Sequence, residues 1–168
     1  VDVNVNVTEK STGNISLGAG YSSSEKVIIS GSISQANIFG SGKFLSLQMN
    51  TGKLNRTIGI NYTNPYFTVD GISQGFDLYH RNVNPTTLGY AFKSQSTGGG
   101  IRFGFPIGEK ETLSFGLAID QTKINIDPVT TATPVQYVDF LKEFGSSNIT
   151  LPATIAWASD TRNSAIYP

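Results

Sequence analysis

The side chains best suited to chemistry are few and far apart in the sequence. His80 is the only histidine, and it has no evident serine or cysteine partner for nucleophilic catalysis. The chain has no cysteine, which excludes a disulfide framework and a thiolate metal site. Gly98-Gly99-Gly100 does not form a phosphate loop, because a strand pattern follows it and no helix does. We therefore expect no enzyme, no cofactor and no bound metal.

Composition narrows the class of protein further. Charged residues are 14% of the 168 residues, against roughly 25% in an ordinary soluble domain, and glycine is abundant at 18 residues. The 12 basic residues balance the 12 acidic ones, so no positive field favours nucleic acid. No apolar run approaches the ~18 residues of a membrane helix, and no signal peptide opens the chain. A membrane protein of this composition must be a β-barrel, and we would then expect a processed or truncated chain.

Eight segments alternate apolar and polar residues with the period of a β-strand, and almost no helix is predicted. They lie at about 14–21, 27–35, 43–50, 56–63, 72–81, 99–105, 113–120 and 150–157. Their polar faces are mostly Gly, Ser, Thr, Asn and Gln, which suits a wet lumen better than the solvent face of a soluble sandwich. The pattern predicts an all-β fold, a transmembrane antiparallel β-barrel. A soluble β-sandwich or lipocalin-like barrel is the alternative.

A few charged residues fall on the polar faces of these segments. They are Asp77, Arg81, Arg102 and Asp120. We interpret them as a solvated or ion-paired lumen wall; contact with a segment inserted into the lumen is the alternative. His80 lies on the opposite face near a strand end, where an interfacial side chain is the simplest interpretation.

The connections predict which end of the barrel is which. Those after even-numbered segments are short (36–42, 64–71 and 106–111), whereas the last two odd-numbered ones are long, as periplasmic turns and external loops are. Within the longest, 122–148, apolar residues recur every three positions between Pro134 and Gly145 and predict a helix. This helix either covers the barrel mouth or binds a partner.

The segment Asn64–Gly71, NPYFTVDG, has the chemistry of a tight turn. Asn-Pro ends a strand ladder because proline has no N–H, and Asp70-Gly71 supplies a residue that tolerates a positive φ. The two aromatic residues inside it would be exposed to water in a soluble protein. They favour a position at a membrane–water boundary.

This turn resembles one in the Omp85 family of outer-membrane insertases. Gly104–Ile107 and the ending Asp160-Thr161-Arg162 with Tyr167-Pro168 resemble the same family, over about residues 3–168. The resemblance implies a sixteen-stranded barrel in the outer membrane of a Gram-negative bacterium, with about eight strands present here. Residues 1–10 then correspond to the last strand of the final POTRA domain. Residues 11–168 correspond to the N-terminal half of the barrel.

The resemblance also implies a function without a catalytic residue. Family members fold and insert outer-membrane proteins, and the exposed edge of the first barrel strand, a lateral gate, pairs with an incoming client strand. The corresponding edge here is Asn14, Ile15, Ser16, Leu17, Gly18, Ala19, Gly20 and Tyr21. The implied partners are outer-membrane protein clients, the lipid bilayer and accessory lipoproteins, the last mostly through the absent POTRA domains.

Other functions remain open at this point. A TamA-like insertase or a two-partner secretion transporter would share the family. A passive porin or ligand-binding barrel is a different class, and the POTRA-like strand at residues 1–10 argues against it. Without the second half of the barrel, we expect this segment alone not to work as an insertase.

Overall fold

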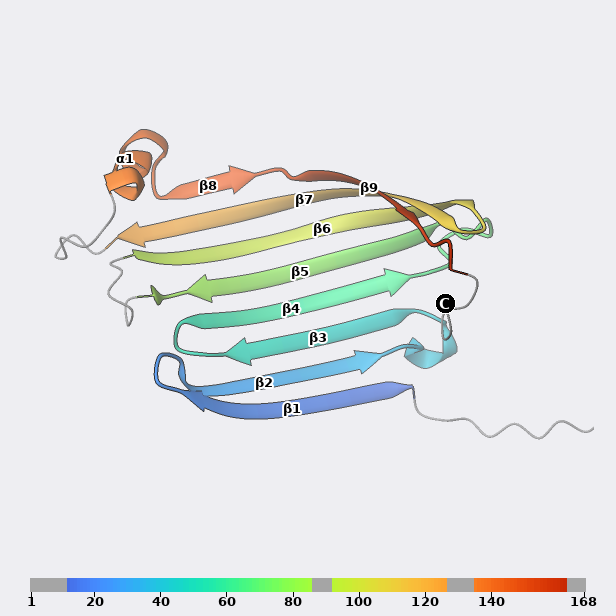
Figure 1. Ribbon diagram of the computed structural model, residues 1–168, viewed down its shortest axis with the longest axis horizontal. Coiled ribbons are helices and arrows are strands. Elements are labelled where there is room, and N and C mark those ends of the chain that lie inside the picture. The colour runs from blue at the N-terminus through green and yellow to red at the C-terminus, as the bar shows by residue number, and fades with distance from the viewer. Residues whose placement is uncertain (1–11, 86–91, 127–134, 163–168) are drawn as a thin grey trace, which may run out of the picture.

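The computed structural model describes residues 12–85, 92–126 and 135–162, which form one antiparallel sheet (Figure 1). Its strands are β1 (Gly13–Ser22), β2 (Lys26–Gln35), β3 (Phe44–Thr51), β4 (Asn55–Asn64), β5 (Ser73–Val83), β6 (Phe92–Gly108), β7 (Glu111–Ile126), β8 (Ser147–Thr150) and β9 (Ala153–Ser159). From β1 to β8 each strand pairs with the next along the chain, and β9 pairs with β7. The predicted strand at residues 1–10 lies outside the described residues.

β8 and β9 are two parts of one barrel strand. Thr150 of β8 lies opposite Asp120, and Ala153 of β9 lies opposite Leu117, so three steps along one strand match three along the other. The Pro152 carbonyl between them still accepts a 2.9 Å hydrogen bond from β7, but its nitrogen has no hydrogen to return. The predicted eighth strand is therefore present, and proline interrupts it without shifting its register.

β6 and β7 are longer than the sequence pattern indicates, at 17 and 16 residues. β6 already begins at Phe92, inside what was expected to be a loop, and the predicted turn at 106–111 narrows to Glu109 and Lys110. A register shift between Pro106 and Gly108 lets β6 continue past its proline. Residues 93–97 are all polar, so both faces of the strand are polar there and the sequence shows no alternation of apolar and polar residues.

Cross-strand pairing gathers the apolar residues of all strands on one face. One row on that face is Ile15, Ile33, Leu47, Ile60, Leu78, Gly99 and Ile119. A neighbouring row on the other face is Ser16, Ser32, Gln48, Gly59, Tyr79, Gly98, Asp120 and Thr150. Apolar side chains remain exposed, as in Leu17 at 84%, and no large side chain of the described residues is fully buried. This sheet therefore has no core of its own, and its apolar face needs lipid.

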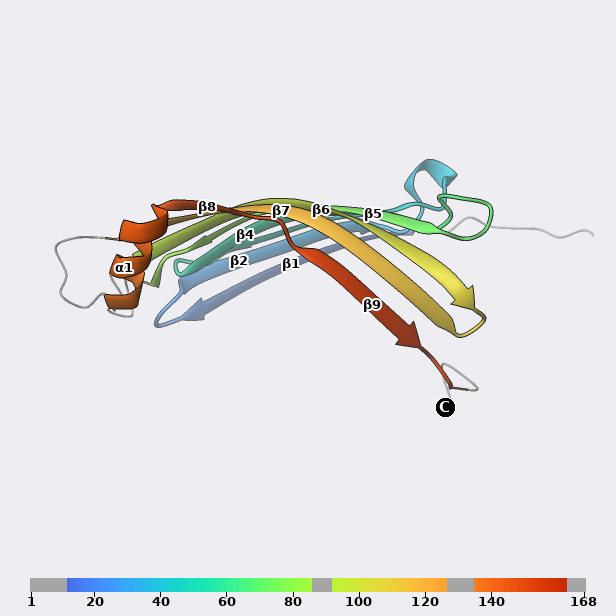
Figure 2. The ribbon, with the colours of Figure 1, turned by 90° about the horizontal axis from the view of Figure 1, so that it is seen from above.

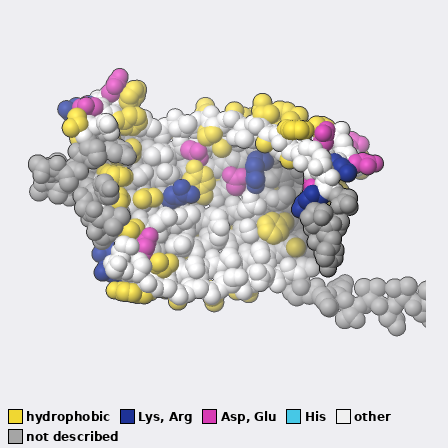
Figure 3. Space-filling model, in the orientation of Figure 1, with side chains coloured by type: hydrophobic (Ala, Val, Ile, Leu, Met, Phe, Trp, Pro, Cys, Tyr) yellow, Lys and Arg dark blue, Asp and Glu magenta, His cyan; other side chains and the backbone are white. Residues whose placement is uncertain are grey.

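The sheet is strongly curved, with its convex side at the top of Figure 2. Its concave side faces the viewer in Figure 1. Figure 3 shows that this concave side is mostly neither hydrophobic nor charged, with a few charged side chains near its middle. A curved sheet with a polar concave face and an apolar convex face is part of a barrel wall.

The short connections after even-numbered strands lie together at one end of the sheet, and the longest connection lies at the other end. The turns β2–β3, β4–β5 and β6–β7 lie at one end of the sheet, and the β7–β8 connection lies at the other (Figure 1). The first contains the short helix η1 (Ile38–Gly40), and the last contains the predicted helix, α1 (Val135–Phe144). Gly145 ends α1 with a φ of +78°, and its amide donates to the Leu141 carbonyl at 3.0 Å.

No helix in the described part of the chain is long and apolar enough to cross a membrane.

A charge on the convex face should be costly. Leu117 lies in the middle of β7 with its side chain 65% exposed on that face. In the full-length protein folded into vesicles, Leu117→Arg should lower the free energy of unfolding by about 2–4 kcal/mol, because an arginine near the bilayer midplane loses its hydration. The control is Thr154→Arg, on the concave face of β9, because Thr154 follows Ala153, which pairs with Leu117. This change should cost much less. Equal costs would contradict the assignment of the two faces.

Candidate functional site

β1 is one edge of the sheet. It pairs with β2 along its whole length, from Gly13 opposite Gln35 to Ser22 opposite Lys26. None of the described strands pairs with its other side, and at the far end of the sheet β8 and β9 pair only with β7. Within the described residues the sheet therefore does not close on itself.

The phase of the β1–β2 ladder decides which backbone groups point to the open side. The Ala36 amide donates to the Thr12 carbonyl at 3.3 Å, and hydrogen-bonded pairs alternate along an antiparallel ladder. The even-numbered residues of β1 therefore bond to β2. The N–H and C=O groups that point away from β2 include those of Ile15, Leu17, Ala19 and Tyr21.

The two sets of residues also carry different side chains. Those with outward-pointing backbone groups place Ile, Leu, Ala and Tyr on the convex face. Those bonded to β2 place Asn14, Ser16, Gly18 and Gly20 on the concave face. The open edge is thus a row of backbone donors and acceptors directly beside the lipid-facing side chains of the same residues.

The two glycines of β1 differ in what surrounds them. A Cβ at Gly18 would stand 2.8 Å from the Ser30 hydroxyl, which would have to rotate away. A Cβ at Gly20 would meet no atom within 4 Å. Packing against β2 therefore does not require Gly20, and its effect is to remove side-chain contacts and to loosen the backbone of β1.

The loop end of the β1–β2 hairpin is fastened by Glu25. Its carboxylate accepts hydrogen bonds from the amides of Leu54 (2.8 Å) and Asn55 (3.4 Å), and its carbonyl accepts one from Lys53 (3.2 Å). A Cβ at Gly52 would collide with that carboxylate. This arrangement, which we call the Glu25 clamp, fixes the hairpin to the β3–β4 turn, and sequence periodicity gives no signal for it.

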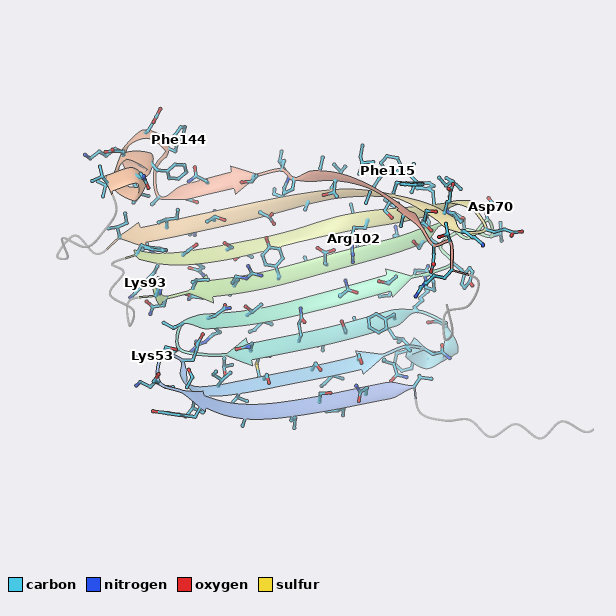
Figure 4. The ribbon with its side chains drawn as sticks, viewed as in Figure 1. Lys53, Asp70, Lys93, Arg102, Phe115 and Phe144 are labelled. Atoms are coloured by element: carbon cyan, nitrogen blue, oxygen red, sulfur yellow. The ribbon has the colours of Figure 1, made fainter. Side chains whose placement is uncertain are left out.

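The four predicted charged residues, Asp77, Arg81, Arg102 and Asp120, lie on the concave face. Arg102 makes an ion pair with Asp77, with 3.1 Å between Nε and Oδ1. Figure 4 shows the side chain of Arg102 over β6. It lies opposite Gly75 and Gly116 in the strand register, beside a hollow of about 460 Å³. The predicted ion-paired wall is therefore confirmed for Asp77 and Arg102.

A second polar contact crosses β6 at a glycine. The Tyr79 hydroxyl donates to Asp120 at 2.7 Å, and Gly98 lies opposite both residues on the strand between them. A Cβ at Gly98 would collide with the Asp120 carboxylate. The glycine triplet thus permits close side-chain approach over β6. In the described residues no cluster of three or more His, Asp or Glu could hold a metal ion.

His80 lies on the convex face, near the end of β5 that is opposite the short turns. Its Nδ1 is 2.8 Å from the Thr97 hydroxyl, and its Nε2 is 3.4 Å from the side-chain nitrogen of Gln95. Polar side chains on this face mark the level at which the apolar rows end. The interfacial role of His80 stays a prediction.

Two of the predicted turn motifs, Asn64–Gly71 and the one that begins at Asp160, lie between or after strands as expected. Asn64–Gly71 joins β4 to β5, Gly71 has a φ of +82°, and the Tyr66 amide donates to Asn64 Oδ1 at 3.3 Å. After β9, Arg162 bonds both carboxylate oxygens of Asp160 at 2.8 and 2.6 Å, which lowers the pKa of that carboxyl. This exposed pair is lost only as the pH falls through the lowered pKa. Tyr167-Pro168 lies outside the described residues.

Comparison with known proteins now decides the family. The sequence profile of the Omp85 superfamily domain matches residues 37–168. The chain belongs to the Omp85 superfamily. The curved sheet is accordingly part of an Omp85 β-barrel, in the outer membrane of a Gram-negative bacterium.

Two similar proteins have the same name. The outer membrane protein assembly factor BamA of Neisseria meningitidis serogroup B is 32% identical over 179 residues, covering 100% of this chain and 22% of that protein. BamA of Nitratidesulfovibrio vulgaris is also 32% identical, over 170 residues, covering 100% of this chain and 20% of its own length. The chain thus spans about a fifth of these relatives.

A solved Omp85 structure has the same fold. It is the crystal structure of BamA from Haemophilus ducreyi lacking POTRA domains 1–3, with a TM-score of 0.62 and 26% sequence identity. The match covers 95% of this chain and 32% of that one. The resemblance predicted from the sequence motifs is therefore confirmed, and the matched region corresponds to part of the BamA barrel.

Breaking the Glu25 clamp should free the hairpin. In the full-length protein Glu25→Ala should cost about 1.5–3 kcal/mol of unfolding free energy, because the carboxylate accepts charge-assisted hydrogen bonds. Amide hydrogen exchange at residues 52–55 should rise with it. Glu109→Ala, at an exposed turn position, is the matched control. Gly52→Ala should add little to Glu25→Ala, since it acts mainly by displacing the same carboxylate; full additivity would contradict the clamp.

Proposed function

We propose that this chain is the N-terminal half of the barrel of an outer-membrane protein assembly factor, and that the open edge of β1 pairs with client strands. The observation that carries the proposal is the row of outward-pointing backbone groups on β1, with no described strand beside it. The name of its relatives, outer membrane protein assembly factor, supports the same function.

The physical basis is the demand of backbone groups in hydrocarbon for hydrogen-bond partners. Each unsatisfied N–H or C=O there costs several kcal/mol, whereas a hydrogen bond in water contributes only about 0.5–1.5 kcal/mol net. A client strand that pairs with β1 satisfies its own backbone and that of the edge together. This exchange of partners needs no ATP, cofactor or reactive side chain.

Pairing through the backbone also explains how one edge serves many clients. Backbone bonds do not depend on client sequence, so selection is left to the two faces. On the convex side the client strand extends the apolar rows that end at Ile15 and at Leu17. On the concave side it meets only Ser16, Gly18 and Gly20. Any strand with alternating apolar and small polar residues fits this edge.

We assign the other parts of the protein by similarity to the Omp85 family. We assign residues 1–10 to the last strand of the final POTRA domain and residues 11–168 to the first half of the barrel. The strand that closes against β1 belongs to the second half. Accessory lipoproteins are assigned to the POTRA domains, so they need not contact the sheet described here.

Proline substitutions at two neighbouring residues distinguish the role of the open edge of β1 from the role of its hydrogen bonds to β2. Ala19→Pro removes an N–H that points to the open side, whereas Gly20→Pro removes one that bonds to β2. In the full-length protein, Ala19→Pro should slow client insertion about 2- to 10-fold, the effect of one lost hydrogen bond, with little change in stability. Gly20→Pro should lower stability more.

The measurements are insertion of a client barrel into vesicles and unfolding of the assembly factor itself. Ala19→Val, which keeps the N–H and adds bulk on the same face, should insert clients at nearly the normal rate. Normal insertion by a folded Ala19→Pro protein would show that the backbone of β1 does not template the client.

A further inference from the structure

Two of the short turns carry large apolar side chains that are mostly or fully exposed. Phe39 in the β2–β3 turn and Val69 in the β4–β5 turn are each 102% exposed, and Tyr66 is 77% exposed. Both turns lie at the end of the sheet where the short connections gather, the periplasmic end of an outer-membrane barrel (Figure 1). Apolar residues at turn tips in plain water would be unfavourable, so their surroundings need an explanation.

The β2–β3 turn holds Phe39 in an unusual conformation. Its φ and ψ are 49° and 35°, the left-handed region that side chains other than glycine rarely adopt. Short hydrogen bonds fix the turn around it, from the Gly42 amide to Asn37 Oδ1 and from the Ser41 hydroxyl to the Ile38 carbonyl, both at 2.6 Å. A phenylalanine kept at such a position points to a use for its ring.

Both turns lie toward the convex, lipid-facing side of the sheet. In Figure 2, η1 stands off above the convex face at the end of β2. In the β4–β5 turn, the Phe67 ring packs edge-on against Phe103, with 6.2 Å between centroids. Phe103 lies in one convex-face row with Phe115 and Ile155. The turns therefore continue the surface that meets lipid.

The convex face becomes polar just before the first of these turns. Along β2 the convex face changes from Ile33 to Gln35, whose amide donates to the Thr12 hydroxyl at 2.8 Å, and the turn follows directly. The turn at residues 36–43 has Lys43 as its only charged residue, which suits an anionic phospholipid headgroup. Aromatic pairs Tyr62–Phe76 and Phe105–Phe115 line the same face nearby.

We propose that the turns at residues 36–43 and 65–72 form a lipid anchor, in which Phe39, Tyr66 and Val69 insert at the boundary between headgroups and acyl chains of the periplasmic leaflet. The partner is the phospholipid surface itself. The contact holds the periplasmic ends of β2 and β3 at a fixed depth, next to the open edge of β1. It depends on membrane embedding of the sheet and not on client pairing.

Spin labels test the depth of the anchor directly. The full-length protein, free of other cysteines, is reconstituted in phosphatidylethanolamine–phosphatidylglycerol vesicles with a nitroxide at Phe39→Cys. Oxygen should relax this label more than a water-soluble nickel chelate does, as for a label at Leu17→Cys on the convex face. A label at Ser32→Cys, on the concave face of β2, should show the opposite preference. A label at position 39 that is open to nickel, or shielded from both reagents by a protein domain, would overturn the proposal.

A second pair of variants separates anchoring from backbone conformation. Phe39→Gly removes the ring and suits the left-handed backbone, whereas Phe39→Trp keeps a large interfacial ring. Folding of the full-length protein into these vesicles should slow several-fold with Phe39→Gly and stay near normal with Phe39→Trp. If Phe39→Gly folded at the normal rate, the ring would have no role at the membrane.

Discussion

Every backbone N–H and C=O inside the hydrocarbon layer needs a hydrogen-bond partner, and a sheet provides one everywhere except along its edges. The described sheet has no buried core, so its ladders and the surrounding lipid must stabilise it. Closing the barrel completely would satisfy both edges. The proposed function uses an edge that stays open or opens readily, where backbone groups can bind a new strand, and β1 is an edge of the described sheet.

β1 lies at one edge of the wall and is paired on one side only, with β2. The Glu25 clamp fixes the loop end of the first hairpin to the β3–β4 turn. Further along the wall, the Asp77–Arg102 pair and the Tyr79–Asp120 hydrogen bond join β5, β6 and β7 across small residues. The concave face of β1 has only hydroxyl, amide and glycine groups. Under the proposed function, the free side of such an edge strand gains a client partner while the pairing of the rest of the wall is unchanged.

Much of this could be predicted from the sequence, because it depends on neighbours in the chain. Alternation in Asn14–Tyr21 gave the faces of β1, and the Asn-Pro and Asp-Gly pairs of Asn64–Gly71 gave the turn. Long-range contacts could not be predicted. Glu25 meets Leu54 at a separation of 29 residues, and Tyr79 meets Asp120 at 41. The alternation of apolar and polar residues likewise does not show which residues of β1 bond to β2, and so it could not predict that the Ala19 N–H points outward.

The most direct test is a disulfide across the seam of the full-length protein. One cysteine replaces Ser16 and the other lies opposite it on the strand that closes the barrel. Client insertion should stop when the bond forms and return when it is reduced, with the barrel folded throughout. A control disulfide between Ser16→Cys and Ser32→Cys, which joins β1 to its existing partner, should leave insertion unchanged. Insertion at the normal rate with the seam locked would contradict the account.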